Sequence, residues 1–122
     1  MILADTSVWI DHFRGQVPGF SPALTDKKIV LHPMVLGELS LGTLPHRKEA
    51  LYNLALLPMT FSATDQEALE FVEIHHLYNF GIGWVDAHLL LSCRLEGHIL
   101  WTHDRNLSSM ARACGIKLKS AD

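Results

Sequence analysis

The sequence predicts an α/β domain built on a short, largely parallel sheet. Strand-like runs alternate with segments of helical periodicity, and the strand-like runs are continuously apolar instead of alternating. Continuous apolar runs are typical of strands whose two faces are both covered by helices. A length of 122 residues and a hydrophobic fraction of 48% suit a single domain, residues 1–122, with a core of its own.

The predicted strands are the short apolar runs. The first covers residues 1–4, the second residues 29–31 and the third residues 98–101. Residues 59–61 are expected to add a brief edge strand, and residues 116–118 a last short strand.

The predicted helices combine apolar residues at helical spacing with start or stop signals. They cover residues 7–14, 34–41, 46–57, 64–80, 84–95 and 106–114. Thr64 and Glu67 form a capping box, Pro33 suits a first helical turn, and Gly115 suits a helix end. The Gly- and Pro-rich residues 15–22 predict a loop, and residues 120–122 a loose tail.

The overall charge shows no basic surplus. Ten Lys and Arg against 13 Asp and Glu give a net charge of −3, so an RNA substrate would need a local basic patch. Cys93 and Cys114 lie in apolar helical patterns without a CxxC motif, which is typical of small buried side chains in a reducing compartment. With no signal-peptide pattern and no membrane-length apolar run, we expect a cytoplasmic protein.

Four carboxylates lie next to apolar segments, where removing a charged group from water costs free energy. Asp5 ends the first predicted strand, and Asp104 follows the strand at residues 98–101. Glu38 and Asp86 interrupt apolar helical patterns. A carboxylate near a buried face is costly unless it is paired or bound to a metal, and ligands of open α/β sheets lie at the carboxyl ends of the strands. Together the four acids predict a site for Mg²⁺ or Mn²⁺, ions that favour carboxylate oxygens.

Each acid also has a structural interpretation. Asp5 and Asp104 could each cap a helix, and Asp86 falls in a first helical turn, where the helix dipole favours an acid. Glu38 has no capping role. Thr6 or Ser7 could cap the first helix instead, which would leave Asp5 free for a metal.

Four segments that contain these acids resemble the PIN-domain ribonucleases, specifically the VapC-type toxins of toxin–antitoxin pairs. The segments are LADTSVWIDHFR, LGELSLG, GWVDAHLLLS and LWTHDRNL, in the family's order. The resemblance implies a three-layer α/β/α sandwich. It also implies a metal site at Asp5, Glu38, Asp86 and Asp104, supported by the hydroxyl residues Thr6, Ser7 and Thr102. His103 stands where such toxins often carry Arg or Lys, which bears on substrate contact.

The resemblance also implies an activity and partners. We expect a Mg²⁺- or Mn²⁺-dependent endoribonuclease that hydrolyses RNA phosphodiester bonds, leaving a 5′-phosphate and a 3′-hydroxyl. It would act as the toxin of a pair, be inhibited by a cognate antitoxin and form a homodimer, with residues 33–57 as a surface for that contact. Asp5 and Asp86 are expected to touch the metal directly and Asp104 through water.

Few side chains are candidates for holding the RNA. Arg14, Arg105 and Arg112 lie near the acids in sequence, and the planar guanidinium suits phosphate. Trp9, Trp84 and Trp101 could stack on bases, but all three lie in apolar patterns, which favours the core.

A phospho-receiver signalling domain is the alternative hypothesis. The length of this chain, its α/β pattern and its predicted acidic Mg²⁺ pocket would also fit a receiver domain. However, such domains pair two acids after the first strand, whereas Asp5 stands alone between Ala4 and Thr6. The second predicted strand runs into His32 and Pro33 without an acid. A binding module that had lost its activity is a third hypothesis, which the presence of all four acids disfavours.

Overall fold

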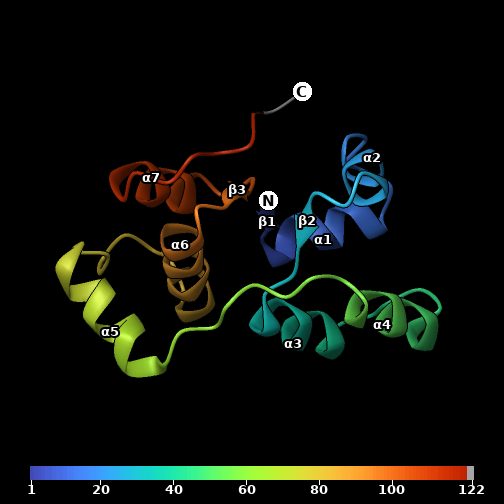
Figure 1. Ribbon diagram of the computed structural model, residues 1–122, viewed down its shortest axis with the longest axis horizontal. Helices are drawn as coiled ribbons and strands as arrows, with labels where there is room; N and C mark the ends of the chain where they lie inside the picture. The colour runs from blue at the N-terminus through green and yellow to red at the C-terminus, as the bar shows by residue number, and fades with distance from the viewer. Residues whose placement is uncertain (121–122) are drawn as a thin grey trace.

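A three-stranded parallel sheet is the centre of the computed structural model, which describes residues 1–120 (Figure 1). The strands are β1 (Ile2–Ala4), β2 (Ile29–Val30) and β3 (Ile99–Trp101), in the order β2-β1-β3. Ile2 pairs with Ile29 on one side and with Ile99 on the other. The predicted α/β class with a short parallel sheet is therefore confirmed. Of the predicted tail, residues 121–122 lie outside the described part.

Two of the predicted strands shrink to single parallel bridges. Met59 pairs with Leu31 and Leu118 with Leu100, so both segments border the sheet without forming strands. The backbone N–H of Phe61 donates to the Glu96 side chain instead of to a neighbouring strand. The N–H of Ile116 donates to the carbonyl of Ala111 at a helix end. In each segment one backbone donor is thus taken by a partner outside the sheet.

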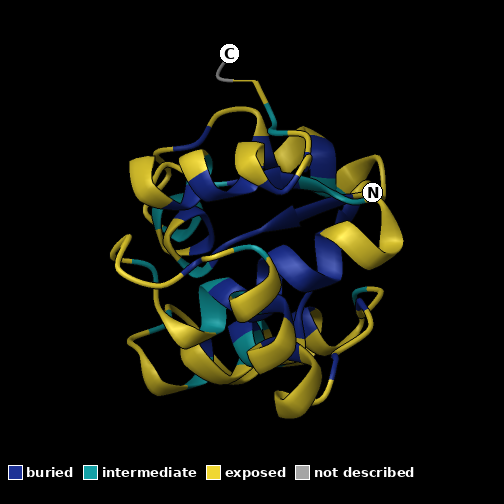
Figure 2. Cartoon of the chain, turned by 90° about the vertical axis from the view of Figure 1, so that its left-hand side faces the viewer, coloured by how far each residue is buried: buried dark blue, intermediate teal, exposed yellow. Residues whose placement is uncertain are grey.

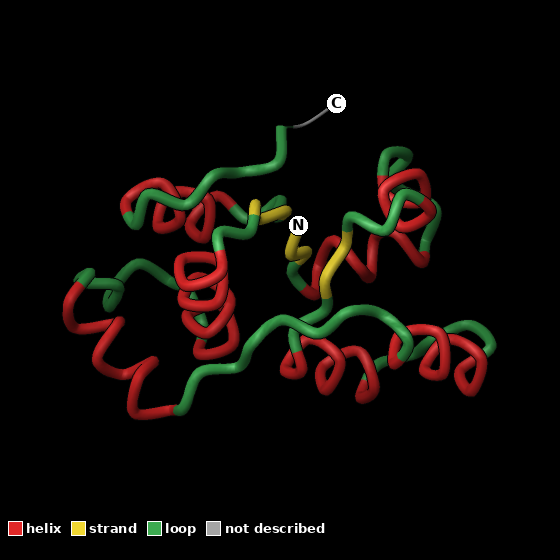
Figure 3. Tube along the Cα trace, in the orientation of Figure 1, coloured by secondary structure: helices red, strands yellow, loops and turns green. Residues whose placement is uncertain are grey.

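Seven helices surround the strands in residues 1–120. They are α1 (Thr6–Phe13), α2 (Phe20–Thr25), α3 (Pro33–Leu41), α4 (Arg47–Ala55), α5 (Asp65–Ile74), α6 (Trp84–Glu96) and α7 (Arg105–Ala113). Figure 3 shows α1–α4 on one side of the strands in this view and α5–α7 on the other. The capping box of Thr64 and Glu67 is present as predicted, and Gly97 ends α6 in the left-handed conformation. None of these helices is both long and apolar enough to span a bilayer.

The predicted loop at residues 15–22 was wrong in its second half. There α2 forms because Phe20 is fully buried and packs edge-to-face with Trp9, with ring centroids 4.7 Å apart. Pro22 stands in the first turn, where its missing N–H costs no helical hydrogen bond. Tertiary packing thus outweighs the loop-like composition.

The predicted helix at residues 64–80 is too long. It ends at Ile74, because the backbone of His76 and of Asn79 takes up positive φ angles of 52° and 68°. Neither is glycine, so the sequence carries no plain stop signal there. Residues 75–83 form a loop between α5 and α6, and Leu77 in this loop is still buried.

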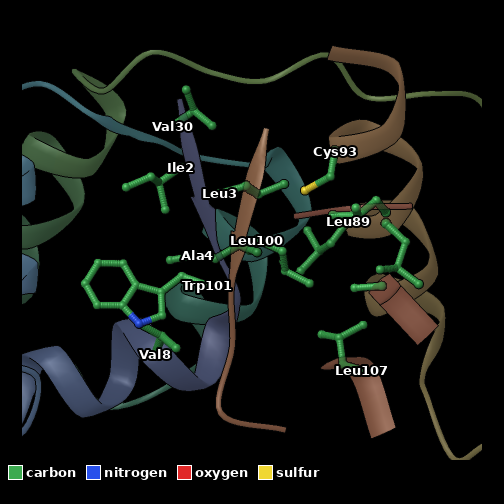
Figure 4. Close-up of a cluster of buried hydrophobic side chains, with 14 of the residues drawn as sticks. Ile2, Leu3, Ala4, Val8, Val30, Leu89, Cys93, Leu100, Trp101 and Leu107 are labelled. Carbon is green, nitrogen blue, oxygen red and sulfur yellow. The ribbon is translucent and has the colours of Figure 1, made fainter. Parts of the chain in front are cut away.

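The core lies along the sheet. Figure 2 shows most of the strand residues in the colour of buried residues, with partly exposed helices around them. Leu3 and Leu100 from neighbouring strands, together with Leu89 and Leu107 from α6 and α7, are fully buried and lie close together in Figure 4. Because the strands are so short, the sheet depends on this helix packing more than on its few hydrogen bonds.

We expect Leu100→Ala to lower the free energy of unfolding by about 3 kcal/mol, because the side chain is fully buried and the substitution leaves a cavity. Leu41→Ala is the control, since Leu41 is 89% exposed, and a change below about 0.5 kcal/mol is expected there. Urea unfolding followed by circular dichroism measures both. Equal losses in the two variants would contradict this description of the core.

Candidate active site

The carboxyl ends of β1 and β3 bring Asp5 and Thr102 together. The ladder continues past the strands, since the Asp5 N–H donates to the carbonyl of Trp101 at 3.0 Å. The Thr102 hydroxyl donates to Asp5 Oδ2 and accepts the Asp104 N–H at 3.0 Å. Thr102 therefore links the first acid to the segment that carries the last one.

Asp5 itself caps α1. Its Oδ1 accepts the backbone N–H of Val8 at 2.9 Å. The expectation that Thr6 or Ser7 would cap this helix was wrong, because the helix begins at Thr6 and the residue before it is the cap. The Thr6 hydroxyl instead donates to Glu38 Oε1 at 2.5 Å and so holds the acid of α3.

Asp86 and Asp104 also lie at helix N-termini. Asp86 stands in the first turn of α6, where its Oδ2 accepts the Gly83 N–H at 3.3 Å. Asp104 caps α7, with its Oδ1 accepting the Leu107 N–H at 2.8 Å. The capping roles that the sequence allowed for Asp5 and Asp104 are thus real. They leave the second carboxylate oxygen of each residue outside its cap.

Three of the four acids line one pocket of about 370 Å³. Its lining residues are Asp5, Thr6, Ser7, Glu38, Gly83, Trp84, Val85 and Asp86. No Lys or Arg is among these described residues. We call this space the acid pocket. Asp104 does not line it, although it is near enough for its charge to act on Asp5 and Asp86.

Burial dominates the electrostatics of the acid pocket. Asp5 is only 4% exposed, and burial raises the pKa of its carboxyl group despite the hydrogen bonds from Thr102 and Val8. Burial also raises the pKa of Asp86, with further repulsion from Asp5, Asp104 and Glu38. The negative charges of the other three acids therefore all act on Asp86, and a bound cation would offset that repulsion.

The donor set fits a hard divalent cation, because it consists of partly desolvated carboxylates from different elements with no basic partner lining the pocket. The carboxylates of the acid pocket do not form a complete metal-coordination site. Within residues 1–120, no three His, Cys, Asp or Glu side chains are placed closely enough to hold one ion between them. The structure thus brings Asp5, Glu38 and Asp86 to one pocket without arranging them around one point.

The predicted substrate cations do not line the acid pocket. Arg14 lines a smaller neighbouring pocket of about 190 Å³, which shares Glu38 with it. Arg105 is the first residue of α7, directly after Asp104, and Arg112 is exposed in the last turn. His103 places its Nδ1 3.5 Å from Asp11, and its charge lowers the pKa of Asp5.

Sequence reasoning did not identify the first turn of α6 as part of the pocket wall. Gly83, Trp84 and Val85 line the acid pocket beside Asp86. Their position immediately before that acid is the signal that could have found them, since residues of a first helical turn share the helix end.

We expect Asp5→Asn to stabilise the metal-free protein at neutral pH. The folded-state pKa of Asp5 is raised above its ordinary value of 3.8, so the native state holds this proton more tightly than the unfolded chain. Stability from this group is therefore lost as pH rises above about 4. The asparagine keeps the Oδ1 cap for Val8 and carries no charge.

Melting temperatures in EDTA between pH 4 and pH 8 measure this effect. The advantage of Asp5→Asn should grow with pH, while Asp26→Asn, a change at the exposed end of α2, should show no such trend. A variant that is less stable than the wild type by the same amount at every pH would contradict the burial argument.

Comparisons with known proteins identify the family and the fold. A family model described as the PIN domain matches residues 2–113. Ribonuclease VapC32 from two strains of Mycobacterium tuberculosis is 40% identical over 119 residues, which is 97% of this chain and 96% of the relative. The crystal structure of PAE2754 from Pyrobaculum aerophilum is similar in fold, with a TM-score of 0.61 at 14% identity over 92% of this chain and 80% of that one. The chain therefore belongs to the PIN-domain family, as a member of the VapC type.

Proposed function

We propose that this protein is a divalent-metal-dependent endoribonuclease and the toxin of a toxin–antitoxin pair. The observation that carries the proposal is the acid pocket, in which carboxylates from three separate elements meet without a lining Lys or Arg among the described residues. The similarity to Ribonuclease VapC32 supports RNA as the substrate. The hydrogen bonds that Asp5 and Asp86 accept at their helix N-termini do not require these acids to lie in one pocket with Glu38.

Asp5, Glu38 and Asp86 would hold Mg²⁺ or Mn²⁺, with Asp104 acting through a water molecule. A bound divalent cation supplies a water of lowered pKa and offsets charge on the scissile phosphate. The chain orients these ligands: Thr102 holds Asp5, and Thr6 holds Glu38. Hydrolysis would leave a 5′-phosphate and a 3′-hydroxyl.

Substrate grip and assembly are further parts of this proposal. Arg14 is the best placed of the three arginines for a phosphate, because its pocket adjoins the acid pocket at Glu38. Arg105 and Arg112 would act from α7. A cognate antitoxin would cover the acid pocket, and the exposed side chains of Tyr52 and Leu56 on and just after α4 support a homodimer surface within residues 33–57. The two free, buried thiols fit a cytoplasmic location.

No observation favours the receiver hypothesis. Asp5 is buried and both of its oxygens accept hydrogen bonds, whereas a phosphorylated carboxylate has to be reached by a phosphodonor. Incubation with acetyl phosphate tests it directly, since a receiver would gain the mass of one phosphoryl group.

We expect Asp5→Asn to lower metal-dependent RNA cleavage by at least about 100-fold, because it removes a charged ligand and keeps the helix cap. The assay follows a labelled single-stranded RNA with Mg²⁺ or Mn²⁺, and EDTA should abolish cleavage. Asp26→Asn should cleave like the wild type. Full activity in Asp5→Asn would overturn the site, and wild-type cleavage that survives EDTA would overturn the metal dependence.

Thr102 is a positioning residue in this scheme. Thr102→Val removes both the donor to Asp5 and the acceptor for the Asp104 N–H, so we expect kcat to fall roughly 10-fold or more. Thr102→Ser keeps the hydroxyl and should restore most of the rate. A Thr102→Val variant as active as the wild type, with a slower Thr102→Ser variant, would show that the methyl group and not the hydroxyl is what matters.

A further inference from the structure

Trp84 differs from the other two tryptophans. Trp9 and Trp101 are 2% and 6% exposed, as the apolar patterns around them predict. Trp84 is 40% exposed, so its prediction as a core residue was wrong. A large aromatic ring in solvent beside a catalytic pocket calls for a partner, since indole is among the side chains that most often carry binding energy.

Trp84 lines two adjoining pockets. Trp84 is the first residue of α6 and lines the acid pocket, two residues before Asp86. It also lines a second pocket of about 250 Å³, which we call the apolar pocket. The lining residues of the apolar pocket are Leu69, Val72, Leu77, Tyr78, Ile82, Gly83, Trp84 and Ala87. Gly83 and Trp84 belong to both linings, so the two pockets adjoin at the start of α6.

The ring is held in place before any ligand arrives. It meets His88 edge to face, with ring centroids 4.8 Å apart and an interplanar angle of 90°. His88 is itself fully buried, and its Nε2 lies 3.1 Å from Asp65 Oδ1 at the start of α5. An indole fixed in this way loses little conformational freedom when a flat group stacks on it.

The lack of basic residues in the described linings of the two pockets favours contact with the bases of an RNA over contact with its phosphates. Within the described residues, neither pocket is lined by Lys or Arg, and three acids line the acid pocket. An apolar side chain of a protein could also fill the apolar pocket. A nucleotide explains more, because its phosphate and base are covalently joined and would span the shared wall between the two pockets.

We propose that the apolar pocket receives an unpaired base next to the scissile phosphate, and that this base stacks on Trp84. The proposal rests on the ribonuclease function proposed above. It makes single-stranded RNA with an extruded base the substrate, because a base within a duplex cannot reach a side-chain platform. Stacking of this kind tolerates every base and adds roughly 10-fold to affinity for each base that stacks.

Binding tests the proposal without cleavage. In an Asp5→Asn background, the affinity for a fluorescein-labelled single-stranded RNA is compared with that for an abasic oligomer of equal length and charge. Adding Trp84→Leu should weaken binding of the intact RNA about 10-fold and leave the affinity for the abasic oligomer unchanged. Trp84→Phe in place of Trp84→Leu should recover most of the lost affinity. Equal affinity of the two proteins for intact RNA, or equal loss for both oligomers, would overturn the stacking.

Tryptophan fluorescence gives a second measurement that does not depend on the leucine variant folding. Intact RNA should quench the emission of the Asp5→Asn protein and the abasic oligomer should not. Trp84→Phe should abolish the quenching, since Trp9 and Trp101 are buried. Quenching that persists in Trp84→Phe would overturn the proposal.

Cleavage by the wild type separates the two proposals. Absence of metal-dependent cleavage, together with base-dependent quenching, would defeat the ribonuclease function and leave a base-binding site at Trp84. Cleavage with a KM that is the same for wild type and Trp84→Leu would leave the ribonuclease function and defeat the base site. If the ribonuclease function and the base site are both correct, Trp84→Leu raises KM about 10-fold with little change in kcat.

Discussion

The carboxylate of Asp5 joins the fold to the site. One oxygen caps α1 through the Val8 N–H, and the other receives the Thr102 hydroxyl from the end of β3. The same residue continues the β1–β3 ladder through its backbone N–H. Strand, helix start and pocket are therefore fixed relative to one another by a single side chain, and its burial is the energetic cost that a bound cation would offset.

Helix N-termini explain how so many acids can gather. Asp5, Asp86 and Asp104 stand at the starts of α1, α6 and α7, where free N–H groups and the helix dipole favour negative charge. Burial still raises the pKa of Asp5 and Asp86, so desolvation and mutual repulsion exceed the capping contribution. The structural interpretation of these residues and the proposed metal-binding one are thus compatible with one geometry, in which the cap uses one carboxylate oxygen of each acid and the second oxygen of Asp5 accepts the Thr102 hydroxyl.

The sequence predicted the parts of this site that follow from the position of a residue directly after a strand. Asp5 and Asp104 follow neighbouring parallel strands, so their meeting at one sheet edge could be expected. The approach of Glu38 and Asp86 depends on where α3 and α6 pack, and periodicity does not encode that; family resemblance supplied it. The hydrogen bond from Thr6 to Glu38 spans 32 positions, and the helix stop at His76 and Asn79 uses non-glycine residues at positive φ, so neither leaves a local signal.

The loop at residues 75–83 has a consequence for divergence within the family. It supplies Leu77, Tyr78 and Ile82 to the apolar pocket, but contributes no strand and none of the four acids. Insertions or exchanges there would reshape the space beside Trp84 while the β1–β3 ladder and the cap of α1 stayed intact. Under the functions proposed above, selectivity among RNAs would therefore evolve in this short segment separately from the proposed metal ligands at the starts of three helices.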